Sequence, residues 1–139
     1  MKVLMRVAVV AVLIASQDAR AANEEAIAQA TEAAKTWLVL VDSGNGARSW
    51  QGAATLFQAG VPQVKWEQSL AAARGPLGAL KGRTVTSAKY ARTLPGAPDG
   101  EYVVIQFSSQ FANKASAVET VTPMRERDGS WKVSGYYIK

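Results

Sequence analysis

The hydrophobic pattern of this 139-residue chain changes its period near Arg83, and that change limits the folds open to it. Before Arg83, apolar residues recur every three or four positions, which is typical of amphipathic helices. After it, apolar and polar residues alternate, which is typical of strands with one buried face. Because the helices come first and the strands follow in one run, we expect an α+β fold with helices packed on an antiparallel sheet.

Three helices are predicted before the change of period. The first begins at an N-cap, Asn23, and ends near Asp42. Acidic residues follow Asn23 in the first turn, where they suit a helix N-terminus. A second is predicted over residues 48–58. A third opens at Pro62, which is favoured in a first helical turn, and ends before Gly75.

Four strands are predicted after the helices, over residues 83–94, 101–111, 116–127 and 131–138. Asp128-Gly129 is a strong signal for a two-residue hairpin turn between the last two strands. Together the elements predict three N-terminal helices on a curved, cone-shaped, four-stranded antiparallel sheet.

The hairpin turns predict a register. With Asp128-Gly129 in the turn, Val121 faces Tyr136, Thr122 faces Gly135 and Met124 faces Val133. A preceding turn at Asn113-Lys114 places Ile105 opposite Thr122. These pairings assign to the face under the helices Val103, Ile105, Phe107, Phe111, Val118, Met124, Trp131, Val133 and Tyr137. Glu119 is assigned to the outer face, where a neighbouring Arg or Lys would make it a surface ion pair.

A ligand cavity is one candidate site on the predicted inner face. Large side chains around a small or polar centre can leave a hollow that suits a small apolar ligand. The residues predicted to line it are Trp37, Trp66, Thr120, Thr122 and Tyr137. The alternative is that the tryptophans are core residues and that helix side chains fill the space.

An apolar patch on the predicted outer face is the second candidate. Exposed apolar side chains in contact usually mark a partner surface. The residues are Val104, Val121, Tyr136 and Ile138. We expect either a homodimer through this sheet face or an unknown periplasmic protein there, and the alternative is burial beneath the chain ends or a loop.

The first 21 residues have the pattern of a cleavable signal peptide. Lys2 and Arg6 precede an apolar run over 7–15, and Ala19-Arg20-Ala21 has the small-x-small pattern of a cleavage site. The apolar run is too short to cross a bilayer as a helix. We therefore expect a signal peptide over 1–21, one domain over 22–139, a periplasmic location and no integral membrane segment after cleavage.

Composition excludes several classes of site. The chain has no histidine and no cysteine, so Ser-His-Asp or Cys-His catalysis and zinc sites built on those ligands are excluded. No metal and no cofactor are predicted. The net charge is +5, and loss of the signal peptide lowers it by two, to +3. The basic residues form no run interleaved with aromatics, so no nucleic-acid partner is expected.

An acid–base pair is the one catalytic arrangement that the residues suggest. Asp42 could act as a carboxylate base with Tyr90 or Tyr137 as the phenolic donor. The alternative is an ion pair with Arg48 or Lys35, since a carboxylate at a helix C-terminus is unfavourable without a cation. No residue is assigned as catalytic.

Several segments resemble a family of small exported bacterial proteins, known as domain of unknown function 4019. The resemblance covers nearly all of the chain after the signal peptide and is carried by residues 37–42 with Gly44, Ser49-Trp50, Trp66, residues 74–78, Leu94-Pro95-Gly96, residues 99–102 and residues 128–137. One departure is Gly46, where an aromatic residue is expected. The element order is also similar to the cone-shaped fold of nuclear transport factor two, and to cystatin-like folds.

The resemblance does not assign a function, because cone-shaped relatives include both enzymes and binding modules. The exported address and the missing catalytic residues favour a non-catalytic binding or assembly module. The alternatives are a small enzyme of the isomerase or lyase type that uses Asp and Tyr in the cone, and an inhibitor or accessory factor that acts through the loop at 94–100.

Overall fold

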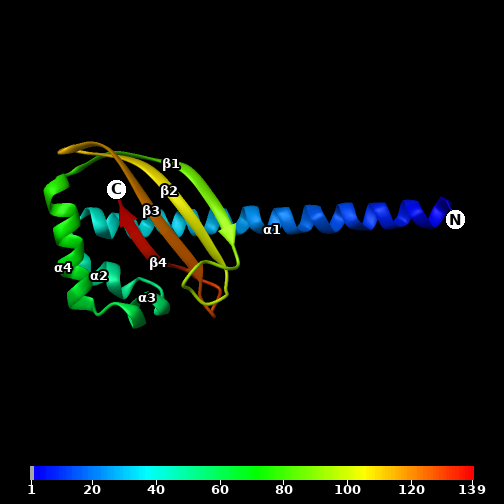
Figure 1. Ribbon diagram of the computed structural model, residues 1–139, viewed down its shortest axis with the longest axis horizontal. Coiled ribbons are helices and arrows are strands. Elements are labelled where there is room, and N and C mark those ends of the chain that lie inside the picture. The colour runs from blue at the N-terminus through cyan, green and yellow to red at the C-terminus, as the bar shows by residue number, and fades with distance from the viewer. Residues whose placement is uncertain (1) are drawn as a thin grey trace.

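The computed structural model describes the backbone of residues 2–139 and the side chains of residues 16–139. Its elements, in chain order, are α1 Lys2–Asp42, α2 Gly46–Gln51, α3 Thr55–Gly60, α4 Gln63–Arg74, a 3-10 turn η1 Gly75–Leu77, β1 Leu80–Ala91, β2 Tyr102–Phe111, β3 Lys114–Arg125 and β4 Trp131–Ile138. The predicted α+β class is confirmed. The strands form one curved antiparallel sheet in the order β1-β2-β3-β4, with the helices on its concave side (Figure 1).

Helix α1 runs without a break through the predicted N-cap Asn23. Its C-terminal part lies along the sheet, and its N-terminal part projects away from the other elements (Figure 1). The residues from 16 to 25 are exposed, and Ala26 is the first buried one. The predicted signal peptide lies inside this helix, and its side chains over 1–15 are outside the described residues. Within the described part of the chain, no helix combines the length and apolar character needed to span a membrane.

The helix predicted over 48–58 is two short helices, α2 and α3. Gly52 ends α2, and Ala54 is extended. The Ala54 N–H donates to the Val133 carbonyl of β4, 2.8 Å away. The break therefore lets the chain form a backbone hydrogen bond with an edge strand, which a continuous helix would not allow.

The predicted register of the last hairpin is correct near the C-terminus. Val121 pairs with Tyr136 and Thr122 with Gly135. The register then shifts between Thr122 and Pro123, so that Pro123 pairs with Val133. Proline has no N–H for the ladder, and such positions favour bulges. Because of the shift, Val133 and Tyr136 both lie on the inner face.

The predicted register between β2 and β3 is wrong by one position. Ile105 pairs with Val121 and not with Thr122. The turn residues are 112–113, since Phe111 pairs with Lys114, and this displacement alone would move the pairing by two positions. An irregularity between Ser109 and Phe111 takes one position back, which leaves a net shift of one. A shift of one residue exchanges the two faces of a strand. Strand β3 accordingly points Glu119 and Val121 inward, whereas the prediction had them outward.

The core lies between α1, α4 and the inner face of the sheet. Its buried residues are Ala30, Ala34, Trp37, Leu38, Val41, Trp66, Leu70, Val103, Ile105, Phe107, Val121 and Val133. Two tryptophans of the core make hydrogen bonds to Ser49 of α2. Trp37 Nε1 donates to the Ser49 carbonyl and Trp66 Nε1 donates to Ser49 Oγ, each at 2.8 Å. These bonds fix α2 between α1 and α4, at the end of the sheet where the candidate site is found.

Candidate functional site

A cluster of charged side chains lies at the end of the core, where α1, α4 and β1 meet. Asp42 ends α1, Arg74 ends α4 and Arg83 comes from β1. Arg83 donates from both terminal nitrogens to the two oxygens of Asp42, at 2.8 and 2.9 Å. Arg74 donates from NH2 to Asp42 Oδ1 at 3.0 Å. The two cations offset the unfavourable position of a carboxylate at a helix C-terminus.

Glu119 extends the cluster into the core. Glu119 is 0% exposed, and its carboxylate accepts hydrogen bonds from three donors. Arg83 Nε donates to Oε1 at 2.7 Å and Ser109 Oγ donates to the same oxygen at 2.6 Å. The Tyr136 hydroxyl donates to Oε2. We refer to Asp42, Arg74, Arg83, Glu119, Ser109 and Tyr136 as the buried charge cluster. Two acids and two bases make it neutral, which lowers the cost of burying it.

The surroundings fix the protonation of two members. Burial disfavours the charged form of Arg83, but its hydrogen bonds to Asp42 and Glu119 outweigh burial and raise the pKa of Arg83. Burial and the adjacent Glu119 charge raise the pKa of Tyr136, and nearby Arg74 offsets part of this rise. Tyr136 is therefore a hydrogen-bond donor at neutral pH.

Arg74 is incompletely paired, in contrast to Arg83. Its side chain is 10% exposed, and within the described part of the chain its Nε and NH1 atoms have no hydrogen-bond partner. The guanidinium carbon lies 4.7 Å from the centroid of the Phe111 ring, a cation–π contact. Buried donors without acceptors each cost about 1–3 kcal/mol. Arg74 can therefore donate hydrogen bonds to a further acceptor.

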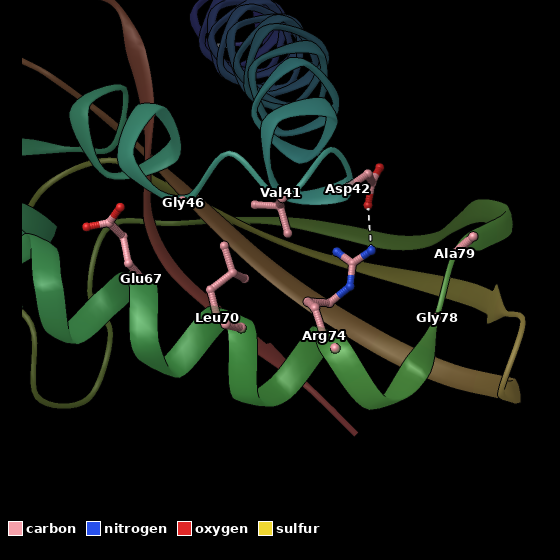
Figure 2. A pocket seen from close by; sticks show the side chains of 11 residues that line it. Val41, Asp42, Gly46, Glu67, Leu70, Arg74, Gly78 and Ala79 are labelled. Atoms are coloured by element: carbon pink, nitrogen blue, oxygen red, sulfur yellow. Dashed lines mark hydrogen bonds and ion pairs between the residues drawn. The ribbon is translucent and has the colours of Figure 1, made fainter.

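A pocket of about 430 Å³ adjoins Asp42 and Arg74. The C-terminal end of α1 and the start of α2 form one side, and α4 and the start of β1 form the other (Figure 2). Gly46 is part of its wall, and a Cβ there would lie 3.1 Å from Glu67 Cγ. A large side chain at position 46 would therefore occupy this space. Glycine at the position where the family resemblance predicts an aromatic residue keeps the pocket open.

The structure does not bring all five residues of the predicted cavity together. Trp37 and Trp66 are buried in the core, as the alternative interpretation held. Thr120, Thr122 and Tyr137 lie on the outer face, because β3 is shifted by one residue from the prediction. Tyr137 is 53% exposed. The predicted location of these three residues on the inner face is wrong. Tyr137 nevertheless lines a small pocket of about 250 Å³ together with Trp66, between α4 and the end of β4.

The predicted outer patch is also not assembled. Val121 is 0% exposed and lies in the core. Tyr136 packs against Trp37, with ring centroids 5.5 Å apart. Ile138 pairs with the inward-pointing Glu119, and Val104 alone of the four predicted residues is on the outer face. The homodimer prediction loses the surface on which it was based.

The proposed acid–base pair is not formed either. Asp42 is an ion-pair residue, as the alternative held, but its partners are Arg74 and Arg83 and not Arg48 or Lys35. The Tyr90 hydroxyl donates to Glu101, and Tyr137 lies on the outer face. The tyrosine that joins the cluster is Tyr136, and Glu119 connects it to Arg83.

Sequence reasoning missed the inward positions of Arg83 and Glu119. The missed signal is the alternation Ala117, Glu119, Val121, in which one charged residue shares a face with small and apolar neighbours. Over residues 116–124 the other face of the same strand, with Val118 and Thr120, carries no charged residue and so favoured the opposite assignment. Without the correct register, the two faces could not be assigned.

Comparison with known proteins places the chain in a family. No curated protein matches it. A family model described as a protein of unknown function, DUF4019, matches residues 33–136. The matched segment starts within α1 and ends at Tyr136, so it includes every member of the buried charge cluster. Because the match covers well over half of its length, the chain belongs to the DUF4019 family.

Proposed function

We propose that this protein is an exported, non-catalytic binding module whose ligand occupies the pocket beside Asp42 and Arg74. The observation that carries the proposal is that the pocket adjoins a nine-tenths buried arginine with two donor nitrogens lacking acceptors. A ligand oxygen that accepts from this guanidinium would relieve that deficit. Val41, Leu70 and Ala79 supply apolar wall for the rest of the ligand.

The pairing of Asp42 favours binding over catalysis. A general base needs a lone pair directed at the proton it removes. Both oxygens of Asp42 accept from Arg83, and one also accepts from Arg74. The carboxylate is thus held as an anchor for two cations. The likeness to the cone-shaped fold of nuclear transport factor two stays a prediction.

Export is supported by the burial pattern of α1. The described residues 16–25 are exposed, so the end of the predicted signal peptide contributes no buried side chain. Cleavage after Ala21 would leave the buried face of α1, which starts at Ala26, in place. We infer that the mature protein begins at Ala22 in the periplasm, which the mass of the protein recovered from a periplasmic extract would test.

The binding proposal is tested by filling the pocket. We would screen a library of small carboxylates and amides by ligand-observed NMR against the wild type and Gly46→Phe. Gly60→Phe is the matched control, because no atom lies within 4 Å of a Cβ at that exposed glycine. Ligands of the pocket should lose affinity about tenfold or more with Gly46→Phe and keep it with Gly60→Phe. Ligands that bind all three proteins equally would contradict the proposal.

A further inference from the structure

The face of α4 that lines the pocket carries an acid, an apolar residue and a base in sequence. Glu67, Leu70 and Arg74 follow at spacings of three and four, which places them on one face of a helix. Figure 2 shows their side chains rising from α4 toward the ends of α1 and α2. Glu67 and Arg74 are seven residues apart, so about 10.5 Å of helix axis separates them.

The acid at one end of this row has no partner. Glu67 is half-buried, and among the described residues it makes neither a hydrogen bond nor an ion pair. Its Cγ lies against Gly46, so the carboxyl group belongs to the wall that this glycine leaves open. An unpaired, half-buried carboxylate favours a ligand cation, because it lacks a compensating charge.

The base at the other end can be shared with a ligand at small cost. Arg74 gives Asp42 one hydrogen bond, whereas Arg83 gives Asp42 two. If Arg74 turned toward a ligand, Asp42 would still have both oxygens bonded to Arg83. The Nε and NH1 atoms of Arg74 would then gain the acceptors that they lack.

We infer that the pocket takes an elongated zwitterion, with its ammonium group at Glu67, its apolar middle over Leu70 and its carboxylate at Arg74. This inference rests on the proposed function and specifies the ligand class. A simple anion would leave Glu67 unpaired, and a simple cation would leave the Arg74 donors unsatisfied. An extended peptide spans about 3.3–3.6 Å per residue, so a peptide of about three residues with both termini free matches the row.

The probe is trialanine, measured by isothermal titration calorimetry against the full chain, beside N-acetyl-trialanine and trialanine amide. Each capped peptide lacks one charge and should bind about tenfold or more weakly than trialanine. Glu67→Gln should weaken trialanine binding and leave N-acetyl-trialanine unchanged. Arg74→Met should weaken trialanine and leave trialanine amide unchanged. Glu32→Gln, an exposed acid on α1, is the control and should change nothing.

The outcomes separate this inference from the proposed function. Capped and free peptides that bind equally, or trialanine affinity that is indifferent to Glu67→Gln, would overturn the zwitterion. Absence of trialanine binding to the wild type would overturn it as well. In each case the proposed function stands if another ligand is found that Gly46→Phe displaces and Gly60→Phe does not. If trialanine binds equally to Gly46→Phe, both proposals are wrong.

Discussion

The buried position of Glu119 predicts a large loss of stability on a change that keeps its shape. Glu119→Gln is nearly isosteric, but it removes the charge on which three donors converge, from Arg83, Ser109 and Tyr136. The amide NH₂ must also face one of these donors, and Tyr136 can meet it only by turning its hydroxyl into an acceptor.

The magnitude follows from what remains after the change. Removing one partner of a buried ion pair costs about 3–5 kcal/mol. Arg83 keeps its two bonds to Asp42, so the lower end of that range applies. We expect the free energy of unfolding at neutral pH to fall by about 3 kcal/mol, out of the roughly 5–15 kcal/mol typical of a domain.

Urea unfolding followed by tryptophan fluorescence measures this loss. With a urea slope of about 2 kcal/mol/M, the midpoint should fall by about 1.5 M. Glu32→Gln is the control, because the Glu32–Lys35 pair is exposed and 3.6 Å apart and is worth about 0–1 kcal/mol. If Glu119→Gln unfolds within 0.5 M or so of the wild-type midpoint, the carboxylate is not the charged centre of the cluster.

Two further predictions concern alkaline pH and a strained turn. The raised pKa of Tyr136 means that the folded protein holds this proton more tightly than the unfolded chain, whose tyrosines titrate near pH ~10. The contribution of this proton to stability is complete below that pH and is lost as the pH rises through the pKa of the folded state. Tyr136→Phe should therefore flatten the fall in the free energy of unfolding at alkaline pH. Equal slopes for the two proteins would refute this. Gly78 has φ +73° and ψ −164°, a region almost restricted to glycine, and a Cβ there would lie 3.1 Å from Ala112 Cβ, so Gly78→Ala should lower the free energy of unfolding by about 1–3 kcal/mol. Gly60→Ala, with open space and no positive φ, should raise it by about 0.4–1 kcal/mol, and the same sign for both changes in thermal unfolding would contradict the backbone argument.

The fold class was predictable because the spacing of apolar residues distinguishes the helices before Arg83 from the strands after it. Strand β4 starts and ends at the predicted residues, Trp131 and Ile138. The predicted pairing of Val121 with Tyr136 is also correct, although the predicted two-residue turn is not. The Glu126 N–H donates to the Ser130 carbonyl, so the loop has three residues, and the bulge at Pro123 restores the predicted pairing beyond it. Where the turn signal was weak, as at residues 112–114, the displaced turn and the irregularity between Ser109 and Phe111 together shift the register by one residue.

The candidate site was not predictable, because it depends on the register of the strands. Its members come from α1, α4, β1, β2, β3 and β4, and a shift of one residue in β3 moves Glu119 from the core to the surface. The bulge beside Pro123 then brings Val133 and Tyr136 to the same face, although alternation alone would separate them. A period-two pattern does not encode bulges, and the ion pairs were hidden with them.

The single backbone bond from Ala54 to Val133 has a consequence for self-assembly. A bare strand at the border of a sheet can template the addition of other chains and so nucleate fibrils. Here the carbonyl of Val133 is already occupied by the segment between α2 and α3. The opposite border, β1, carries the exposed Lys81 and Lys89, whose charges repel an approaching copy. The segment between α2 and α3 therefore blocks strand addition at Val133 on one border, and the lysines oppose it on the other.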